Sequence, residues 1–160
     1  MTKSIMQLYR FSPIQDREQL NKAVVYVATK TSELCGRIIG QTLPITSLTI
    51  FAHYLEEYEH LIKILNELGT YYNENNGLRI VLNTQIKIGN NTITHLRIRK
   101  PDPYRMQVGC NDFYVENYSE FKKQYLTTHP NNLRLINRAE YEMIEFFDPD
   151  FDVLAYVLSN

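Results

Sequence analysis

The chain has 160 residues, 44% of them hydrophobic, and a formal net charge of −1 at pH 7. This length suits one well-buried core and falls in the usual size range of a single domain. A charge near zero gives no overall field that would attract nucleic acid or an anionic membrane, and no apolar run approaches the roughly 20 residues of a membrane span. We therefore expect no nucleic-acid partner and no membrane partner.

The cysteines and the N-terminus favour a cytoplasmic location. Two cysteines, Cys35 and Cys110, are too few for a disulfide framework. The first 20 residues lack the apolar core of a targeting signal. We expect the protein to stay in a reducing compartment.

Residues 1–43 are predicted to be an N-terminal helical segment. Ser12 is a suitable cap with Pro13 at the first helical position, and the helix should end near Gly36 or Gly40. Between them an apolar stripe recurs at steps of three and four residues: Leu20, Val24, Val27, Thr31, Leu34 and Ile38. We expect this stripe to pack on the protein's own domain; the alternative is a surface for a partner or for self-association.

The domain itself is expected over residues 44–160 and opens with a unit that covers residues 44–100. A period-two strand from Ile45 gives way to a helix over 55–69, whose apolar positions follow helical spacing. Three strands follow, over 70–75, 78–88 and 91–100, separated by Asn-Asn-Gly and Gly-Asn-Asn turns. The predicted order is β-α-β-β-β.

A second unit over residues 106–158 repeats this order. It falls on the first at an offset of 63 residues (110 − 47), so that Tyr58 meets Phe121. The prolines of the sequence 100–104 break any strand between the units. A strand over 108–115, a helix over 118–127 and strands over 133–137, 141–147 and 151–158 are predicted.

The double βαβββ order, the segment Asp-Phe-Tyr-Val-Glu-Asn-Tyr-Ser-Glu-Phe and the closing Asp-Pro-Asp-Phe-Asp-Val-Leu-Ala resemble the vicinal oxygen chelate superfamily. That group holds the glyoxalases, the extradiol dioxygenases and the bleomycin-resistance proteins. The resemblance covers residues 44–158 and implies an α+β fold in which two tandem βαβββ units form one cupped mixed sheet, here preceded by the helical segment.

The resemblance also implies a divalent metal in the cup, held by two histidines and two glutamates. Those four positions fall on Ser47, Arg97, Cys110 and Ala155, so none of the usual ligands is present. Alanine supplies no donor atom and arginine adds a repelling charge. We therefore expect no metal and no other cofactor.

Strand alternation predicts what faces the cup, because residues two apart share a face. The predicted cup residues are Ser47, Thr49, Phe51, His53, Ile93, His95, Arg97, Arg99, Cys110, Asp112, Tyr114, Val153, Ala155 and Val157. The opposite, apolar face is predicted to pack against helices through Leu48, Ile50, Leu96, Ile98, Phe113, Val115, Leu154 and Leu158.

The polar cup residues form the candidate ligand site: Ser47, His95, Arg97, Arg99, Cys110, Asp112 and Tyr114. Guanidinium groups present a planar fork that matches carboxylate or phosphate, so a small anionic or polar ligand is expected. The alternative is that Arg97 pairs with Asp112 while Arg99 is solvated at the strand end.

Three functions stay open. The favoured one is a small-ligand-binding protein without a catalytic metal. The second is a divergent isomerase, lyase or dioxygenase that uses His95, Cys110 or Glu145, although no catalytic residue is assigned. The third is a structural or partner-binding protein, with homodimerisation through the N-terminal helix and the sheet edges.

Overall fold

The structure, a computed structural model, describes residues 8–159. Within this range the helices are α1 (Arg17–Ile39), α2 (Leu55–Leu68) and α3 (Tyr118–Tyr125). The strands are β1 (Ile45–Phe51), β2 (Gly69–Glu74), β3 (Leu78–Ile88), β4 (Asn91–Arg99), β5 (Gly109–Phe113), β6 (Leu133–Asn137), β7 (Glu142–Phe146) and β8 (Val153–Leu158).

The eight strands form one mixed sheet in the order β2-β3-β4-β1-β5-β8-β7-β6. In each half the first strand lies parallel to the last, β1 beside β4 and β5 beside β8. The two halves meet where β1 and β5 pair antiparallel. The predicted α+β fold, a cupped mixed sheet of two tandem βαβββ units behind an N-terminal helix, is confirmed.

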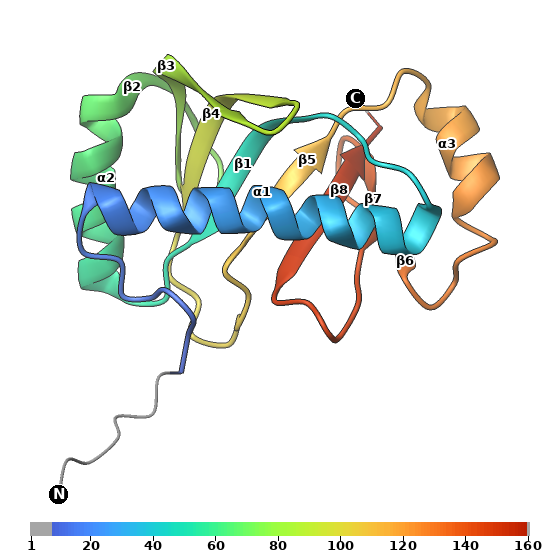
Figure 1. Ribbon diagram of the computed structural model, residues 1–160, viewed down its shortest axis with the longest axis horizontal. Coiled ribbons are helices and arrows are strands. Elements are labelled where there is room, and N and C mark those ends of the chain that lie inside the picture. The colour runs from blue at the N-terminus through green and yellow to red at the C-terminus, as the bar shows by residue number, and fades with distance from the viewer. Residues whose placement is uncertain (1–7, 160) are drawn as a thin grey trace, which may run out of the picture.

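The helices lie on one face of this sheet. Figure 1 shows α1 running across the strands, with α2 at the β2 end and α3 at the β6 end. Their apolar residues share one large core with the strands, and every residue of the predicted α1 stripe is buried. The opposite face carries no helix and only a small apolar cluster, formed by Phe51, Cys110, Leu154 and Tyr156.

The predicted start of α1 is wrong by four residues. The N-cap is Asp16, whose side chain accepts a hydrogen bond from the Gln19 amide at 2.8 Å. Ser12 is instead buried against Glu57, so its hydroxyl does not cap the helix. The C-cap of α1 is Gly40, which has φ +74° and whose amide donates to the Gly36 carbonyl.

The predicted faces of β8 are wrong as well. Val153, Ala155 and Val157 belong to the large core under the helices, whereas Leu154 and Tyr156 lie in the cluster on the helix-free face. The strand is apolar on both sides, so alternation alone does not fix its phase, and a slip of one residue exchanges the faces.

Two further cup assignments fail for local reasons. Ile93 lies in the large core, next to the point where the register between β3 and β4 shifts, and a bulge interrupts strict alternation. His53 follows the end of β1, where strand alternation no longer applies.

Residues 8–16 form a segment before α1, here termed the N-terminal strap. Tyr9 and Arg10 of the strap are tied to the second half of the chain, because Tyr9 donates to the Pro103 carbonyl at 3.1 Å and Arg10 pairs with Asp152 at 2.8 Å. Within residues 8–159 no helix has both the length and the apolar character needed to cross a membrane. The start of the segment predicted to lack a targeting signal, residues 1–7, lies outside the described range, as does Asn160.

Candidate functional site

The strand register places polar side chains in two rows across the helix-free face. One row runs through Arg79, Arg97, Thr49 and Cys110, on β3, β4, β1 and β5. The next row runs through His95, Ser47, Asp112, Tyr156, Glu145 and Arg134, on β4, β1, β5, β8, β7 and β6. Residues distant in sequence therefore meet at the middle of the sheet.

A cavity of about 450 Å³ opens on this face. That volume is within the usual range of small-molecule pockets. Its walls come from both halves of the sheet and from the turns at its ends: Phe51, Asn75, Asn76, Arg79, Arg97, Arg99, Arg105, Cys110, Asp112, Arg138, Tyr141, Met143, Tyr156 and Leu158. Five of these residues are arginines and one is an acid.

Arg97 is held in place by neutral oxygen atoms. Its Nε donates to Thr49 Oγ1 at 3.1 Å, and its Nη1 donates to the Asn75 carbonyl at 2.9 Å. The alternative expectation of an ion pair with Asp112 is not met, because among the described residues Arg97 lies within 4.0 Å of no carboxylate. The charge of Arg97 is therefore oriented without being neutralised.

Arg99 is the cavity arginine with an acidic neighbour. Its Nη2 lies 3.8 Å from Asp102, and its guanidinium lies over the Phe51 ring, 4.8 Å from the centroid. The side chain is thus packed on an aromatic face and is not solvated as the alternative expectation required.

The other cavity arginines have no ion pair within residues 8–159. Arg79 faces Arg97 across the β3–β4 pair, and its Nε is buried without a hydrogen-bond partner. Arg105 comes from the linker between the units and Arg138 from the turn after β6. Three cationic groups therefore reach the cavity without a carboxylate of the described residues within 4.0 Å.

Asp112 is the acid of the cavity. Burial raises the pKa of its carboxyl, and the charges of Arg79 and Arg97 act in the opposite direction. Over the described part of the chain its side chain makes no hydrogen bond and no ion pair. It is a carboxyl group that is free to interact with a ligand.

Cys110 lines the cavity but is a poor nucleophile. It is 4% exposed, and burial raises the pKa of its thiol to about 11, against a weaker opposing effect of Arg97. The thiolate is the reactive form of cysteine. At neutral pH this residue is an uncharged, packed thiol.

The remaining predicted site residues do not line the cavity. Ser47 is partly buried with an unpartnered Oγ. The His95 ring packs edge-on against Tyr72, with centroids 4.8 Å apart, and burial lowers its pKa. Tyr114 follows β5 and is 58% exposed.

Several cavity residues were missed at the sequence level. Arg79 could have been found, because Leu78, Ile80 and Leu82 occupy the alternate positions of its strand and are buried. Arg105, Arg138 and Tyr141 lie outside regular strands, where no periodicity indicates direction.

Glu145 lies on the same face of the sheet, next to Tyr156, which lines the cavity. It is 2% exposed, pairs with Arg134, and accepts a hydrogen bond from the Tyr156 hydroxyl at 3.0 Å. Burial raises the pKa of Tyr156, and the Glu145 charge adds to that shift. Glu145 is therefore engaged on both sides and is unsuited to act as a free base.

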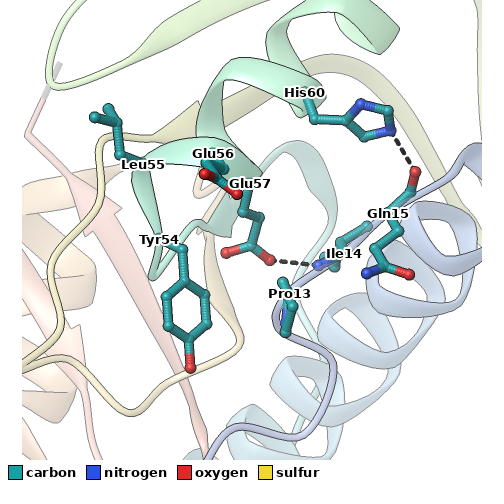
Figure 2. A pocket seen from close by; sticks show the side chains of 8 residues that line it. All are labelled: Pro13, Ile14, Gln15, Tyr54, Leu55, Glu56, Glu57 and His60. Atoms are coloured by element: carbon teal, nitrogen blue, oxygen red, sulfur yellow. Dashed lines mark hydrogen bonds between the residues drawn. The ribbon is translucent and has the colours of Figure 1, made fainter.

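A larger hollow, of about 840 Å³, lies elsewhere, between the N-terminal strap and the start of α2 (Figure 2). Its acid, Glu57, is 3% exposed and already occupied. The carboxylate accepts from the amides of Ile14 at 2.6 Å and His53 at 2.7 Å, as well as from the Ser12 hydroxyl at 2.5 Å. Figure 2 shows the Glu57 carboxylate directed at Ile14 of the strap.

Ser12, His53 and Glu57 resemble a hydrolase triad in composition but not in arrangement. The hydroxyl of Ser12 lies between the carboxylate and His53 Nδ1, 2.8 Å from the latter, whereas a triad needs the imidazole in the middle. His53 Nε2–H donates to the Gln107 carbonyl at 3.1 Å, and the Tyr9 ring stacks on the imidazole at 3.9 Å. The adjoining cavity measures only about 10 Å³, which leaves no room for a substrate, so these residues hold the N-terminal strap in place.

No group of three or more histidine, cysteine, aspartate or glutamate side chains within residues 8–159 is arranged to hold a metal ion. Of the four residues that the predicted resemblance assigns to metal-ligand positions, Arg97 and Cys110 line the cavity, Ser47 lies beside it and Ala155 lies in the core.

No family model and no curated protein matches the sequence. A solved structure described as "Structural Genomics, Protein EC4020" has the same fold, with a TM-score of 0.71 over 97% of this chain and 93% of that chain. The two sequences are 11% identical, so the likeness concerns the fold alone.

Proposed function

We propose that the protein binds a small anionic molecule in the cavity of the helix-free face, on a scaffold of the vicinal oxygen chelate type and without a catalytic metal. The observation that carries the proposal is the gathering of five arginines around about 450 Å³ of open space. Concave sites lined by one sign of charge focus their field on an oppositely charged ligand.

Two structural features support a binding role. The arginines come from β3, β4, the linker and the β6–β7 turn, so the fold has to be complete before they meet. Arg97 is also fixed at two of its nitrogens, which reduces the entropy lost when an anion binds. We further propose a cytoplasmic location, which the two unpaired, buried cysteines support.

Binding is tested by isothermal titration calorimetry with sulfate, inorganic phosphate, malonate and citrate at constant ionic strength. We expect at least one of these anions to bind the unaltered protein and Arg97→Ala to weaken it by at least tenfold. That factor corresponds to about 1.4 kcal/mol, typical for a charge-assisted contact.

Arg17→Ala is the matched control. Arg17 is about half exposed, pairs with Glu67 on the surface and is remote from the cavity lining, so its loss changes the net charge equally without touching the site. Equal weakening by both substitutions, or no binding by any of the four anions, would refute the proposal.

An enzymatic function on the same scaffold is a second candidate, favoured by one observation. Asp112 is a partly buried carboxyl with a raised pKa in a cavity, the type of group that serves as a general acid or base. Conversion of a bound anion, seen by NMR and abolished by Asp112→Asn, would establish it.

A further inference from the structure

The charges of the cavity do not balance. Arg99 has Asp102 at 3.8 Å, which leaves the arginines at positions 79, 97, 105 and 138 without an ion pair in the described chain. Against these four positive charges the cavity contains the single carboxyl of Asp112. A singly charged anion would leave most of this charge unmatched.

Asp112 adds a second requirement. It lies beside the arginines but accepts no hydrogen bond from them, and its Cα neighbours across the sheet are Ser47 and Tyr156. An anion drawn to the arginines would bring further negative charge towards this carboxyl. A carboxylate oxygen and an oxygen of the anion are both acceptors, so they form a hydrogen bond with each other only when one of the two groups carries a proton.

We propose that the ligand is a compact oxyanion with at least two negative charges, and that Asp112 binds it as the protonated carboxyl, donating its O–H to a ligand oxygen. The inference rests on the proposed anion-binding function and names the charge of the ligand and the role of the acid. Phosphate esters and small polycarboxylates share this chemistry.

The ligand's charge is tested with probes of equal shape. Sulfate and methanesulfonate are both tetrahedral oxyanions, with two charges and one charge respectively. We expect sulfate to bind the unaltered protein at least tenfold more tightly at constant ionic strength. Equal affinity would overturn the inference.

Phosphate and malonate then distinguish the two classes of ligand, phosphate esters and small polycarboxylates. Tighter binding of phosphate indicates a phosphate ester, and tighter binding of malonate indicates a polycarboxylate. Both results support the shared chemistry, whereas binding of both phosphate and malonate more weakly than methanesulfonate contradicts it.

The role of Asp112 is tested by titrating sulfate between about pH 5 and pH 9, where the charge of sulfate is constant. We expect affinity for the unaltered protein to fall as pH rises above the pKa of Asp112, by up to tenfold per pH unit, because binding then includes the uptake of a proton. Asp112→Asn keeps an N–H donor of the same shape, so it should bind sulfate with much less dependence on pH.

The Asp112→Asn variant separates Asp112 from the other titratable groups of this face, because any pH dependence that they cause, including that of Glu145, stays in the variant. Burial and Arg79 lower the pKa of His95, and any loss of its charge would weaken anion binding as pH rises, but that effect would remain in Asp112→Asn. Burial keeps the pKa of Cys110 at about 11 and raises that of Tyr156, so both stay protonated throughout. The arginines stay charged at every pH tested.

These results distinguish anion binding itself from the charge of the ligand and the protonation of Asp112. If no anion binds, the proposed function fails. If anions bind through Arg97 but methanesulfonate equals sulfate, or Asp112→Asn abolishes binding or keeps the same pH dependence, only the present inference fails. The pH series on the unaltered protein needs no substitution, so it decides even where a variant folds poorly.

Discussion

At the scale of single residues, Glu57 ties the N-terminal strap to the start of α2. Its carboxylate accepts two backbone amides and one hydroxyl, all buried. Glu57→Ala would leave these donors unsatisfied, and we expect it to lower the free energy of unfolding by about 3 kcal/mol. Urea denaturation measures the loss.

Its neighbour in the same helical turn provides the control. Glu56 is exposed, so Glu56→Ala should change stability by less than about 0.5 kcal/mol. Similar losses for both substitutions would mean that the buried hydrogen bonds of Glu57 contribute little.

His53 should make stability depend on pH. Burial lowers its pKa in the folded state below the ordinary 6.5, with Glu57 partly opposing the shift. Between the folded and the unfolded pKa, unfolding takes up a proton at His53. The contribution of neutral His53 to the free energy of unfolding is therefore present above pH 6.5 and is lost as pH falls below that value. His95 adds a change in the same direction.

The experiment compares unfolding free energies at about pH 7.5 and pH 5.5. We expect a smaller decrease between the two for His53→Gln than for the unaltered protein, by up to about 1.4 kcal/mol. An unchanged decrease would show that the imidazole is not desolvated by the strap.

At the scale of elements, α1 contains a glycine that no neighbour requires. Gly36 is inside the last turns of the helix, and a Cβ added there meets no atom within 4 Å. Gly36→Ala should stabilise the protein by about 0.5–1 kcal/mol, because alanine loses less backbone entropy in a helix. The melting temperature, measured by thermal denaturation, should rise by roughly 1–4 °C.

Gly109 gives the opposite case. A Cβ there would overlap the Thr49 carbonyl across the β1–β5 pair, where the two halves meet. Gly109→Ala should therefore destabilise the protein, and a stabilising effect would contradict the close approach of these strands.

The same elements show what the sequence could predict. The buried face of α1 could be predicted because apolar residues recur at helical spacing along it and polar residues lie between them. Ser12 looked like a helix cap, yet Glu57, 45 residues away, binds its hydroxyl. β8 is apolar on both faces, so only its pairing with β5 fixes which side chains reach the cavity.

At the scale of the whole molecule, the candidate site depends on contacts between distant segments. Arg97, Arg99, Cys110 and Asp112 could be predicted because they lie on regular strands. Arg105 and Arg138 could not, since the direction of a turn is set by tertiary packing. The net charge of −1 also conceals a strongly cationic cavity, because acidic residues elsewhere balance it.

Because the cavity draws arginines from both halves, a bound anion should stabilise the fold as one unit. At a hundred times its dissociation constant, sulfate should add about 2.7 kcal/mol and raise the melting temperature by roughly 5–10 °C. Arg79→Gln in the first half and Arg138→Gln in the second should each reduce this shift, while Arg17→Ala leaves it unchanged. Differential scanning calorimetry measures the shift as well as the shape of the transition. A reduction by Arg79→Gln alone would confine the ligand to the first half of the sheet, and the second half would then have no part in binding.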